Sequence, residues 1–297
     1  MTSSSPSQTP NVIWNPSDYA ANSASQLVWA HELMARLQLR GDERILDVGC
    51  GDGKVTAELL RAVPHGSVVG IDSSPEMIRY AAGKFSGPPF ANLQFKVMDA
   101  RQIHFRQRFD LVVSNAALHW VDDHPAFLRG AATGLHNGGR LVVSCGGQGN
   151  ASEVFLALCG VLRLKQWRDY FRKLEAPYFF HRPEDYERWL PRHGLCASSI
   201  KLSPKNASHE NRSAFASWFR TTWMPYTQRV PEAAREEFIA AVVARYLMKN
   251  PADAHGHVHV RMVRLEIDAV KASRPSCDEP VSEACGCGES PGGAPAK

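Results

Sequence analysis

The sequence of 297 residues lacks a long hydrophobic run. Its longest uncharged apolar stretches, such as 111–121 and 141–145, are far shorter than the ~20 residues that a helix needs to cross a bilayer. The first twelve residues contain no lysine, no arginine and no hydrophobic segment of the kind found in secretory signals. We therefore expect no membrane span, no signal peptide and a cytoplasmic protein.

The chain also lacks a strong positive charge, and its number of cysteines is odd. Lys and Arg total 34 against 30 Asp and Glu, a net charge of +4, and no block of five basic residues occurs. Nothing therefore favours a nucleic-acid partner. Four of the seven cysteines lie in apolar or glycine-rich surroundings typical of buried, reduced thiols, so we expect no disulfide framework. The oligomeric state is left open, with a monomer as one option.

Both ends of the chain are poor in large apolar residues. Residues 1–12 are mostly Ser, Thr, Pro and Gln, and residues 272–297 are mostly Pro, Gly, Ser, Glu and Cys. Such segments cannot bury enough apolar surface to offset their chain entropy, so we expect both to be disordered.

The first half of the remaining chain alternates strand-like and helix-like segments, which is typical of βαβ units on a parallel sheet. Pro75 follows Ser73 and Ser74, a pattern that predicts the start of a helix over 75–84. Helices are also expected at 53–62 and 125–135. The predicted strands are 44–48, 67–71, 93–98, 109–114 and 140–144.

After Cys145 the pattern changes to amphipathic segments rich in aromatic residues, expected as helices at 153–166, 183–191, 212–224 and 231–248. Two more strand candidates, 196–202 and 258–269, could complete the sheet at its edge. The fold class expected is α/β, a Rossmann-like doubly wound sheet of seven strands. Its domains are a core over 13–150 and a region over 151–271 holding a helical cover, inserted after strand five and between the last two strands.

A glycine-rich turn follows the first predicted strand and opens a helix, where doubly wound folds bind nucleotide-like ligands. It contains Asp47, Gly49, Gly51 and Gly53. A dinucleotide fingerprint would need glycine at Lys54, which disfavours NAD. The spacing D-x-G-x-G-x-G instead resembles the first motif of the class I S-adenosylmethionine-dependent methyltransferases.

This resemblance implies S-adenosylmethionine as the cofactor and assigns further residues to it. Asp72 ends the second strand, where a carboxylate can accept both ribose hydroxyls. By analogy with the family, Asp99 and Ala100 lie beside the adenine amine, and Ser73 and Met77 lie around the adenosine. Asn115 is assigned to the cofactor as well.

The methyl acceptor is expected after the fourth strand, where His119 and Trp120 follow Asn115 and are the candidate catalytic residues. The N/D-P-P-Y/F motif of base-amine methyltransferases is missing there. The run S-N-A-A-L-H-W-V-x-D-H, with Trp14, Tyr19 and Gln26 upstream, resembles the trans-aconitate methyltransferase group. In that family the N-terminal segment forms a lid, which implies that Tyr19 and Gln26 contact the cofactor and Trp14 the substrate.

The resemblance implies O-methylation of a carboxylate on a small organic acid. A carboxylate is ionised at neutral pH, because carboxyl pKa values are ~4, so no general base is needed. We expect Arg220, Tyr226 and Arg229 in the cover to hold the acid. Two alternatives remain open: a phenol, amine or carbon-acid acceptor, for which only His119 offers a base, and a non-catalytic cofactor-binding protein.

Two further motifs carry no assigned function. His255, His257 and His259 alternate, but no carboxylate or thiolate lies at a matching local spacing, so we expect no metal. Cys277, Cys285 and Cys287 form a C-x7-C-x-C pattern that could bind soft metals, and its role is left open.

Overall fold

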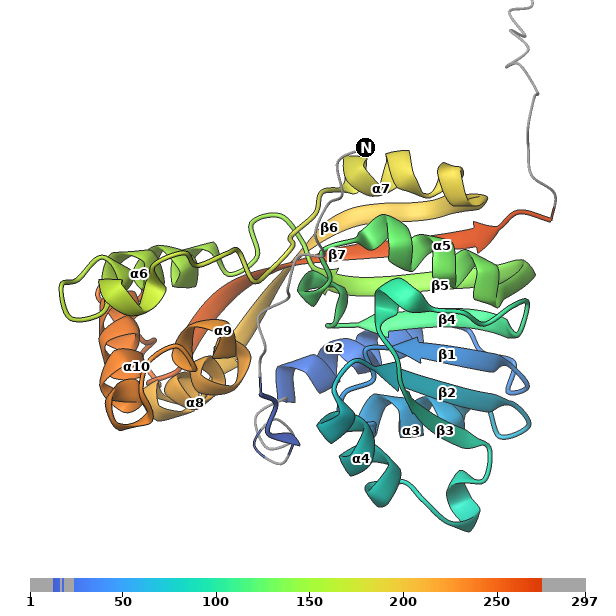
Figure 1. Ribbon diagram of the computed structural model, residues 1–297, viewed down its shortest axis with the longest axis horizontal. Helices are drawn as coiled ribbons and strands as arrows, with labels where there is room; N and C mark the ends of the chain where they lie inside the picture. Colours follow the sequence, from blue (N-terminus) through green and yellow to red (C-terminus); the bar gives the residue numbers. More distant parts are fainter. Residues whose placement is uncertain (1–12, 17, 19–23, 274–297) are drawn as a thin grey trace, which may run out of the picture.

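The computed structural model describes residues 13–16, 18 and 24–273. Figure 1 shows an α/β part built on a twisted sheet and a smaller helical part, joined by two long strands. We refer to these parts as the sheet lobe and the helical lobe. The predictions for Tyr19, for residues 1–12 and for the three tail cysteines concern residues outside the described part of the chain.

The sheet has seven strands in the order β3-β2-β1-β4-β5-β7-β6. Strands β1 to β5 pair in parallel, and β7 pairs antiparallel with both β5 and β6. The predicted fold class is therefore confirmed. The strand bounds are β1 (Arg44–Val48), β2 (Ser67–Asp72), β3 (Leu93–Val97), β4 (Phe109–Asn115), β5 (Leu135–Gly146), β6 (Leu195–His209) and β7 (Val258–Lys271).

Two apolar clusters cover the two faces of this sheet. One joins α2 (Ala24–Ala35) and α3 (Lys54–Ala62) to β1, β2 and β4. The other joins α5 (His124–Gly134) and α7 (Pro183–Trp189) to the opposite face. Helix α4 (Pro75–Lys84) begins as the sequence predicts, because the Ser74 hydroxyl accepts a hydrogen bond from the Met77 N–H at 3.2 Å and Pro75 occupies the first turn.

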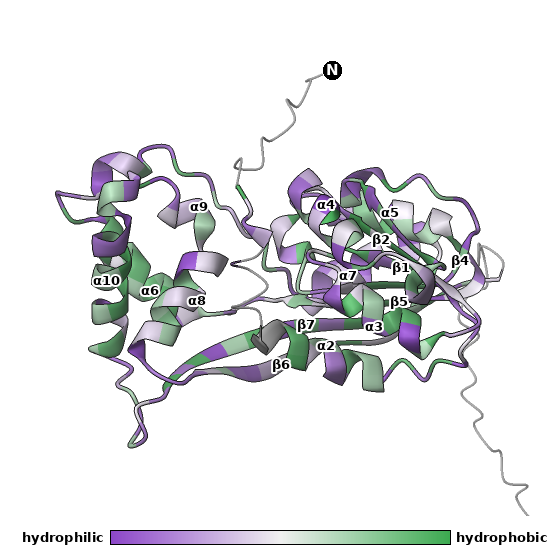
Figure 2. Cartoon of the chain, turned by 90° about the horizontal axis from the view of Figure 1, so that it is seen from below, coloured by the Kyte–Doolittle hydropathy of each residue, from purple (hydrophilic) through white to green (hydrophobic). Residues whose placement is uncertain are grey.

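The helical lobe has an apolar core of its own. It is built from α6 (Ser152–Leu162), α8 (Arg212–Thr222), α9 (Met224–Thr227) and α10 (Glu232–Leu247). Phe215, Phe219 and Phe238 are completely buried between these helices. Figure 2 shows the hydrophobic (green) residues of α6 and α10 in this lobe, at a distance from the green strands of the sheet. Short 3-10 helices cover 88–90, 100–102, 118–120, 168–171 and 191–193.

Strand β6 is about twice as long as the sequence predicts. It pairs with β7 from Leu195 opposite Lys271 to His209 opposite Val258. The second half of the strand was not predicted, because the segment Ser203–Asn206 is polar and includes Pro204, which is uncommon inside strands. Beyond the pairing of Gly146 with Arg264, β7 pairs as a strand only with β6, so the two strands leave the sheet as a ribbon that carries the helical lobe.

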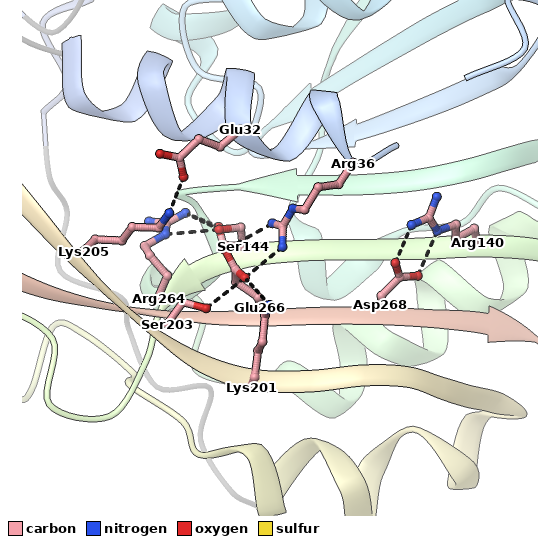
Figure 3. A network of polar contacts seen from close by, with 10 residues as sticks. All are labelled: Glu32, Arg36, Arg140, Ser144, Lys201, Ser203, Lys205, Arg264, Glu266 and Asp268. Atoms are coloured by element: carbon pink, nitrogen blue, oxygen red, sulfur yellow. Dashed lines mark hydrogen bonds and ion pairs between the residues drawn. The ribbon is translucent and has the colours of Figure 1, made fainter. Parts of the chain in front are cut away.

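Ion pairs fix α2 against this ribbon (Figure 3). Arg36 donates to both carboxylate oxygens of Glu266, at 2.8 and 3.1 Å, and Ser203 donates to the same carboxylate at 2.9 Å. Lys205 pairs with Glu32 farther along. The base of the ribbon is therefore held in place beside the first helix.

Two expectations about residue environment can be checked in the described part of the chain. Cys50 and Cys145 are buried free thiols, whereas Cys159 and Cys196 are free but exposed, so local surroundings were a poor guide to burial for those two. None of the helices in the described residues is both long and apolar enough to cross a membrane.

Candidate active site

A cavity of about 420 Å³ lies where the two lobes meet. Its floor is formed by the turns that follow β1, β2, β3 and β4, at the carboxyl edge of the sheet. Its opposite wall comes from the helical lobe and the ribbon. The lining from that side consists of Asn150, Ala151, Tyr178, Phe180, Trp218, Thr222, Trp223, Met262 and Arg264.

The glycine turn after β1 passes close under this cavity. The N–H groups of Gly49 and Cys50 both donate to the Ile71 carbonyl, at 2.8 and 3.0 Å, which ties the turn to β2. Gly49 has φ +76°, and a Cβ there would overlap the Cβ of Ala117. Gly49 and Gly51 line the cavity, whereas Gly53 packs behind it, where a Cβ would lie 2.8 Å from Ala81 and Phe95.

Asp72 occupies the cavity floor at the end of β2. One carboxylate oxygen accepts from the Gly51 N–H at 3.0 Å and the other from the Ser74 N–H at 2.9 Å. Burial raises the pKa of this carboxyl group, and the two backbone donors act in the opposite direction. Asp72 therefore sits in a fixed orientation beside Ser73 and Met77, which line the same part of the cavity.

Asp47 lies away from the main cavity. Its side chain is buried and accepts a hydrogen bond from the Thr56 hydroxyl at 2.7 Å. Burial raises its pKa to about 7. With Gly49 and Asn115 it lines a separate, smaller cavity behind the glycine turn. The contact with Thr56 indicates that Asp47 helps to set the conformation of the turn.

Asp99 and Ala100 line the cavity at the end of β3, as their predicted role requires. The Asp99 carboxylate is held by Arg101, whose Nε and Nη2 donate to it at 3.0 and 2.6 Å. Arg101 also pairs with Asp122 at 2.9 Å. This guanidinium is therefore bound by two carboxylates at the cavity rim.

His119 lies in the short helix η3 (Leu118–Trp120) after β4 and lines the cavity beside Trp120. Its Nδ1 is 3.3 Å from the backbone N–H of Gly146. Since a backbone N–H can only donate, Nδ1 is the acceptor, and the neutral ring carries its proton on Nε2. Burial, followed by repulsion from Arg264 and His124, lowers the pKa of His119 to about 3. His119 is therefore a neutral hydrogen-bond donor through Nε2.

A continuous aromatic wall extends from His119 into the helical lobe. Trp120 contacts Trp14 and Tyr178 with ring centroids 5.3 and 4.8 Å apart. Tyr178 stacks on Phe180 at 5.7 Å and meets Trp223 at 5.6 Å. All of these rings line the cavity.

The structure brings none of the three residues predicted to bind the acid to this cavity. Arg220 pairs with Asp18 at 3.1 Å, and Arg229 is exposed. Tyr226 is buried in the core of the helical lobe. Gln26 lies on α2, but its side chain is outside the described part of the chain, as is Tyr19.

Sequence reasoning missed Arg264, which lines the cavity from β7. It is buried and donates to the carbonyl and hydroxyl of Ser144 (Figure 3). It also donates to Asn115 Oδ1 and lies 5.0 Å from the centre of the Trp29 ring. The sequence could have indicated this, because Arg264 is an even number of residues from the buried Val258 and Val260 and so shares their face of the strand. Asn150 and Met262 were missed as well, whereas Trp218 and Thr222 belong to the stretch around Arg220 in which the acid-binding residues were expected.

The histidine run lies on the distal part of the ribbon. Contrary to expectation, a carboxylate is nearby: Asp253 Oδ2 is 2.9 Å from His259 Nε2 and 3.6 Å from His257 Nδ1. A turn before β7 folds Asp253 back onto these rings. Within the described residues, no group of three or more His, Cys, Asp or Glu side chains is arranged to hold a metal ion.

Comparisons with known proteins agree with this geometry. Residues 45–139 match the family described as a methyltransferase domain. An uncharacterized methyltransferase of Schizosaccharomyces pombe is 34% identical over 191 residues, covering 63% of this chain and 72% of the relative. A trans-aconitate 2-methyltransferase of Rhodopseudomonas palustris is 26% identical over 264 residues, 87% of this chain and 99% of the relative.

The fold also matches solved structures. The YcgJ protein of Bacillus subtilis superposes with a TM-score of 0.56 at 17% identity, covering 84% of this chain and 98% of that one. Family model, relatives, strand order and glycine turn all lead to one conclusion. The chain belongs to the class I S-adenosylmethionine-dependent methyltransferases, in the trans-aconitate methyltransferase-like group.

Proposed function

We propose that this enzyme transfers the methyl group of S-adenosylmethionine to a carboxylate of a small organic acid. The observation that carries the proposal is the hydrogen bond from the Gly146 N–H to His119 Nδ1. The Nδ1 lone pair is taken by this N–H, and Nε2 bears the proton, so neither nitrogen can serve as a base. An ionised carboxylate needs no base, and it can accept the hydrogen bond that Nε2 offers.

The cavity fits the cofactor. Asp72 presents a fixed, half-buried carboxylate that can accept the two ribose hydroxyls, and Met77, Met98 and Val121 supply apolar surface beside it for a flat base. Gly49 and Gly51 let the backbone approach a ligand without side chains between them. When bound, S-adenosylmethionine supplies an electrophilic methyl group on a sulfonium sulfur.

The remaining contribution of the chain is alignment and exclusion of water. His119 donates to the acceptor oxygen that does not attack, which orients the other oxygen. Trp120, Tyr178 and Phe180 close the cavity around it with ring surface. The trans-aconitate methyltransferases among its relatives support an acid as the acceptor.

The test is to identify the bond formed. The protein is incubated with methyl-labelled cofactor and mono-, di- and tricarboxylic acids, and the product is treated with base. We expect release of labelled methanol, because esters hydrolyse under conditions that leave methylamines and methyl ethers intact. A base-stable product formed from a phenol or amine would contradict carboxyl methylation while leaving the methyltransferase assignment in place.

A further inference from the structure

We propose, on the basis of carboxyl O-methylation as proposed above, that the acceptor is a monocarboxylic acid with an apolar, unsaturated or aromatic body. The cavity offers hydrogen-bond donors for one carboxylate at one end and aromatic surface along the rest. A tricarboxylate such as trans-aconitate does not match this lining.

The charges around the cavity disfavour a trianion. The described lining contains three carboxylates, Asp72, Glu76 and Asp99, and two guanidinium groups, Arg101 and Arg264. Residues 1–12, 17 and 19–23, the N-terminal positions outside the described part, include no lysine or arginine. An acceptor with three carboxylates would therefore face a lining whose side chains carry more negative than positive charges.

Both guanidinium groups of the lining are also engaged by the protein. Arg101 binds Asp99 and Asp122, so its charge is balanced by two carboxylates. Arg264 is held by Ser144 and Asn115 beneath the cavity surface. Additional carboxylates on a ligand would have to compete with these contacts.

Two side-chain donors of the cavity lining, His119 and Asn150, adjoin Gly146. Its N–H fixes the ring of His119, whose protonated Nε2 is the first donor. The second is the Asn150 amide: Oδ1 accepts from the Val263 N–H at 3.0 Å, which assigns the NH₂ group to the other side. That NH₂ nitrogen lies beside Gly146, 2.9 Å from where a Cβ would be. Two neutral donors suit one carboxylate.

The rest of the acceptor side presents mainly ring surface, and two of its hydroxyl groups are used within the lobe. The Tyr178 hydroxyl donates to the Thr222 carbonyl at 2.8 Å, and the Thr222 hydroxyl donates to the Trp218 carbonyl at 2.6 Å. Trp14, Trp120 and Trp223 add further rings. Such a wall favours a planar or apolar body through burial and ring contacts.

Binding to the complex with S-adenosylhomocysteine tests this without requiring turnover. Calorimetry compares three acids: trans-cinnamate, with one carboxylate and a phenyl ring; crotonate, with the same unsaturated carboxylate but no ring; and trans-aconitate, with three carboxylates. We expect cinnamate to bind at least tenfold more tightly than either of the others. Any other ranking, including undetectable binding of cinnamate, would overturn the inference.

A pair of variants locates the effect. Trp120→Leu removes a ring from the wall and should weaken cinnamate binding at least fivefold while changing crotonate binding less than twofold. Trp189→Leu is the matched control, because Trp189 is also partly buried but packs against the core of the sheet lobe, away from the cavity. An equal loss of cinnamate affinity in both variants would contradict the aromatic wall as the binding surface. So would an equal loss of affinity for cinnamate and crotonate in Trp120→Leu.

Failure of this inference can be distinguished from failure of the proposed function. If trans-aconitate binds best and yields a base-labile methyl ester, carboxyl methylation stands and the preference for an apolar monoacid is wrong. If the products formed are base-stable, carboxyl methylation itself is wrong.

Discussion

The two sides of the cavity are built on different principles. On the sheet side, backbone turns and carboxylates at consecutive strand ends form the surface, and each is placed by a short local motif. On the helical side, rings from segments far apart in the sequence, such as Trp14, Tyr178 and Trp223, meet only through packing. The side that we assign to the cofactor is thus local in sequence, and the side that we propose selects the acceptor is assembled by the tertiary fold.

This difference predicts that single changes on the sheet side will be the most damaging. Gly49→Ala should lower the free energy of unfolding by roughly 2 to 5 kcal/mol, because the new Cβ overlaps Ala117 and φ is +76°. Gly87→Ala is the control: φ is +85° but nothing lies within 4 Å, so only about 1 kcal/mol of backbone strain is expected. Urea denaturation measures the free energy of unfolding of both variants. Equal losses of stability would show that the turn at Gly49 is not tightly packed.

Removal of the carboxylate at the end of β2 tests the cofactor side directly. Asp72→Ala should weaken binding of S-adenosylhomocysteine by about 10- to 100-fold, because hydrogen bonds to a charged group contribute roughly 1.5 to 3 kcal/mol. Asp42→Ala, at an exposed position before β1, should leave the affinity unchanged. Isothermal titration calorimetry gives both constants. Unchanged affinity in a folded Asp72→Ala protein would remove this residue from the cofactor site.

His119 lies at the junction of the two sides, so its variants report on the chemistry. His119→Gln keeps a donor and should retain turnover, whereas His119→Phe loses it and should reduce kcat/KM by a further tenfold or more. Neither the parent nor His119→Gln should show an ionisation near pH ~6.5 in its rate profile, since His119 is neutral in the folded parent. A profile governed by an imidazole in the parent and lost in His119→Gln would favour an amine or phenol acceptor.

The depressed pKa of His119 also affects stability. Its folded value is about 3, below the ordinary 6.5, so the folded state binds fewer protons and loses stability as the pH falls below about 6.5. Relative to the non-titrating His119→Gln, the parent should lose up to ~1.4 kcal/mol per pH unit in that range. The raised pKa of buried Asp47 has the opposite effect on the pH dependence of stability. Because Asp47 is present in both proteins, its effect cancels in the comparison. Denaturation at pH 8, 7, 6 and 5 measures the difference in the free energy of unfolding between the parent and His119→Gln. This difference should be constant between pH 8 and 7.

The smallest effect is expected at the C-terminal end. Deletion of residues 274–297 should change the free energy of unfolding by less than about 0.5 kcal/mol and leave kcat/KM unchanged, because the segment contains little apolar surface to bury. A large loss of activity would instead assign a function to Cys277, Cys285 and Cys287.

The sequence alone was sufficient for the order of strands and helices in the sheet lobe, because strand alternation, the Ser74-Pro75 helix start and the D-x-G-x-G-x-G turn are local signals. It also predicted that Asp72, Asp99 and His119 follow strand ends, which parallel pairing brings to one edge. The length of β6 was missed, because the register with β7 stabilises a segment whose own pattern is polar.

The acceptor side was decided by the tertiary structure. Arg220 looked suitable for an acid from its neighbours in sequence, but the fold pairs it with Asp18, while Arg264 from a distant strand reaches the cavity. The state of His119 depends on a single N–H from Gly146, 27 positions later in the chain. Composition and spacing identify which groups are available. Only the packing of the two lobes determines which of them are buried, which are paired, and therefore what chemistry they can perform.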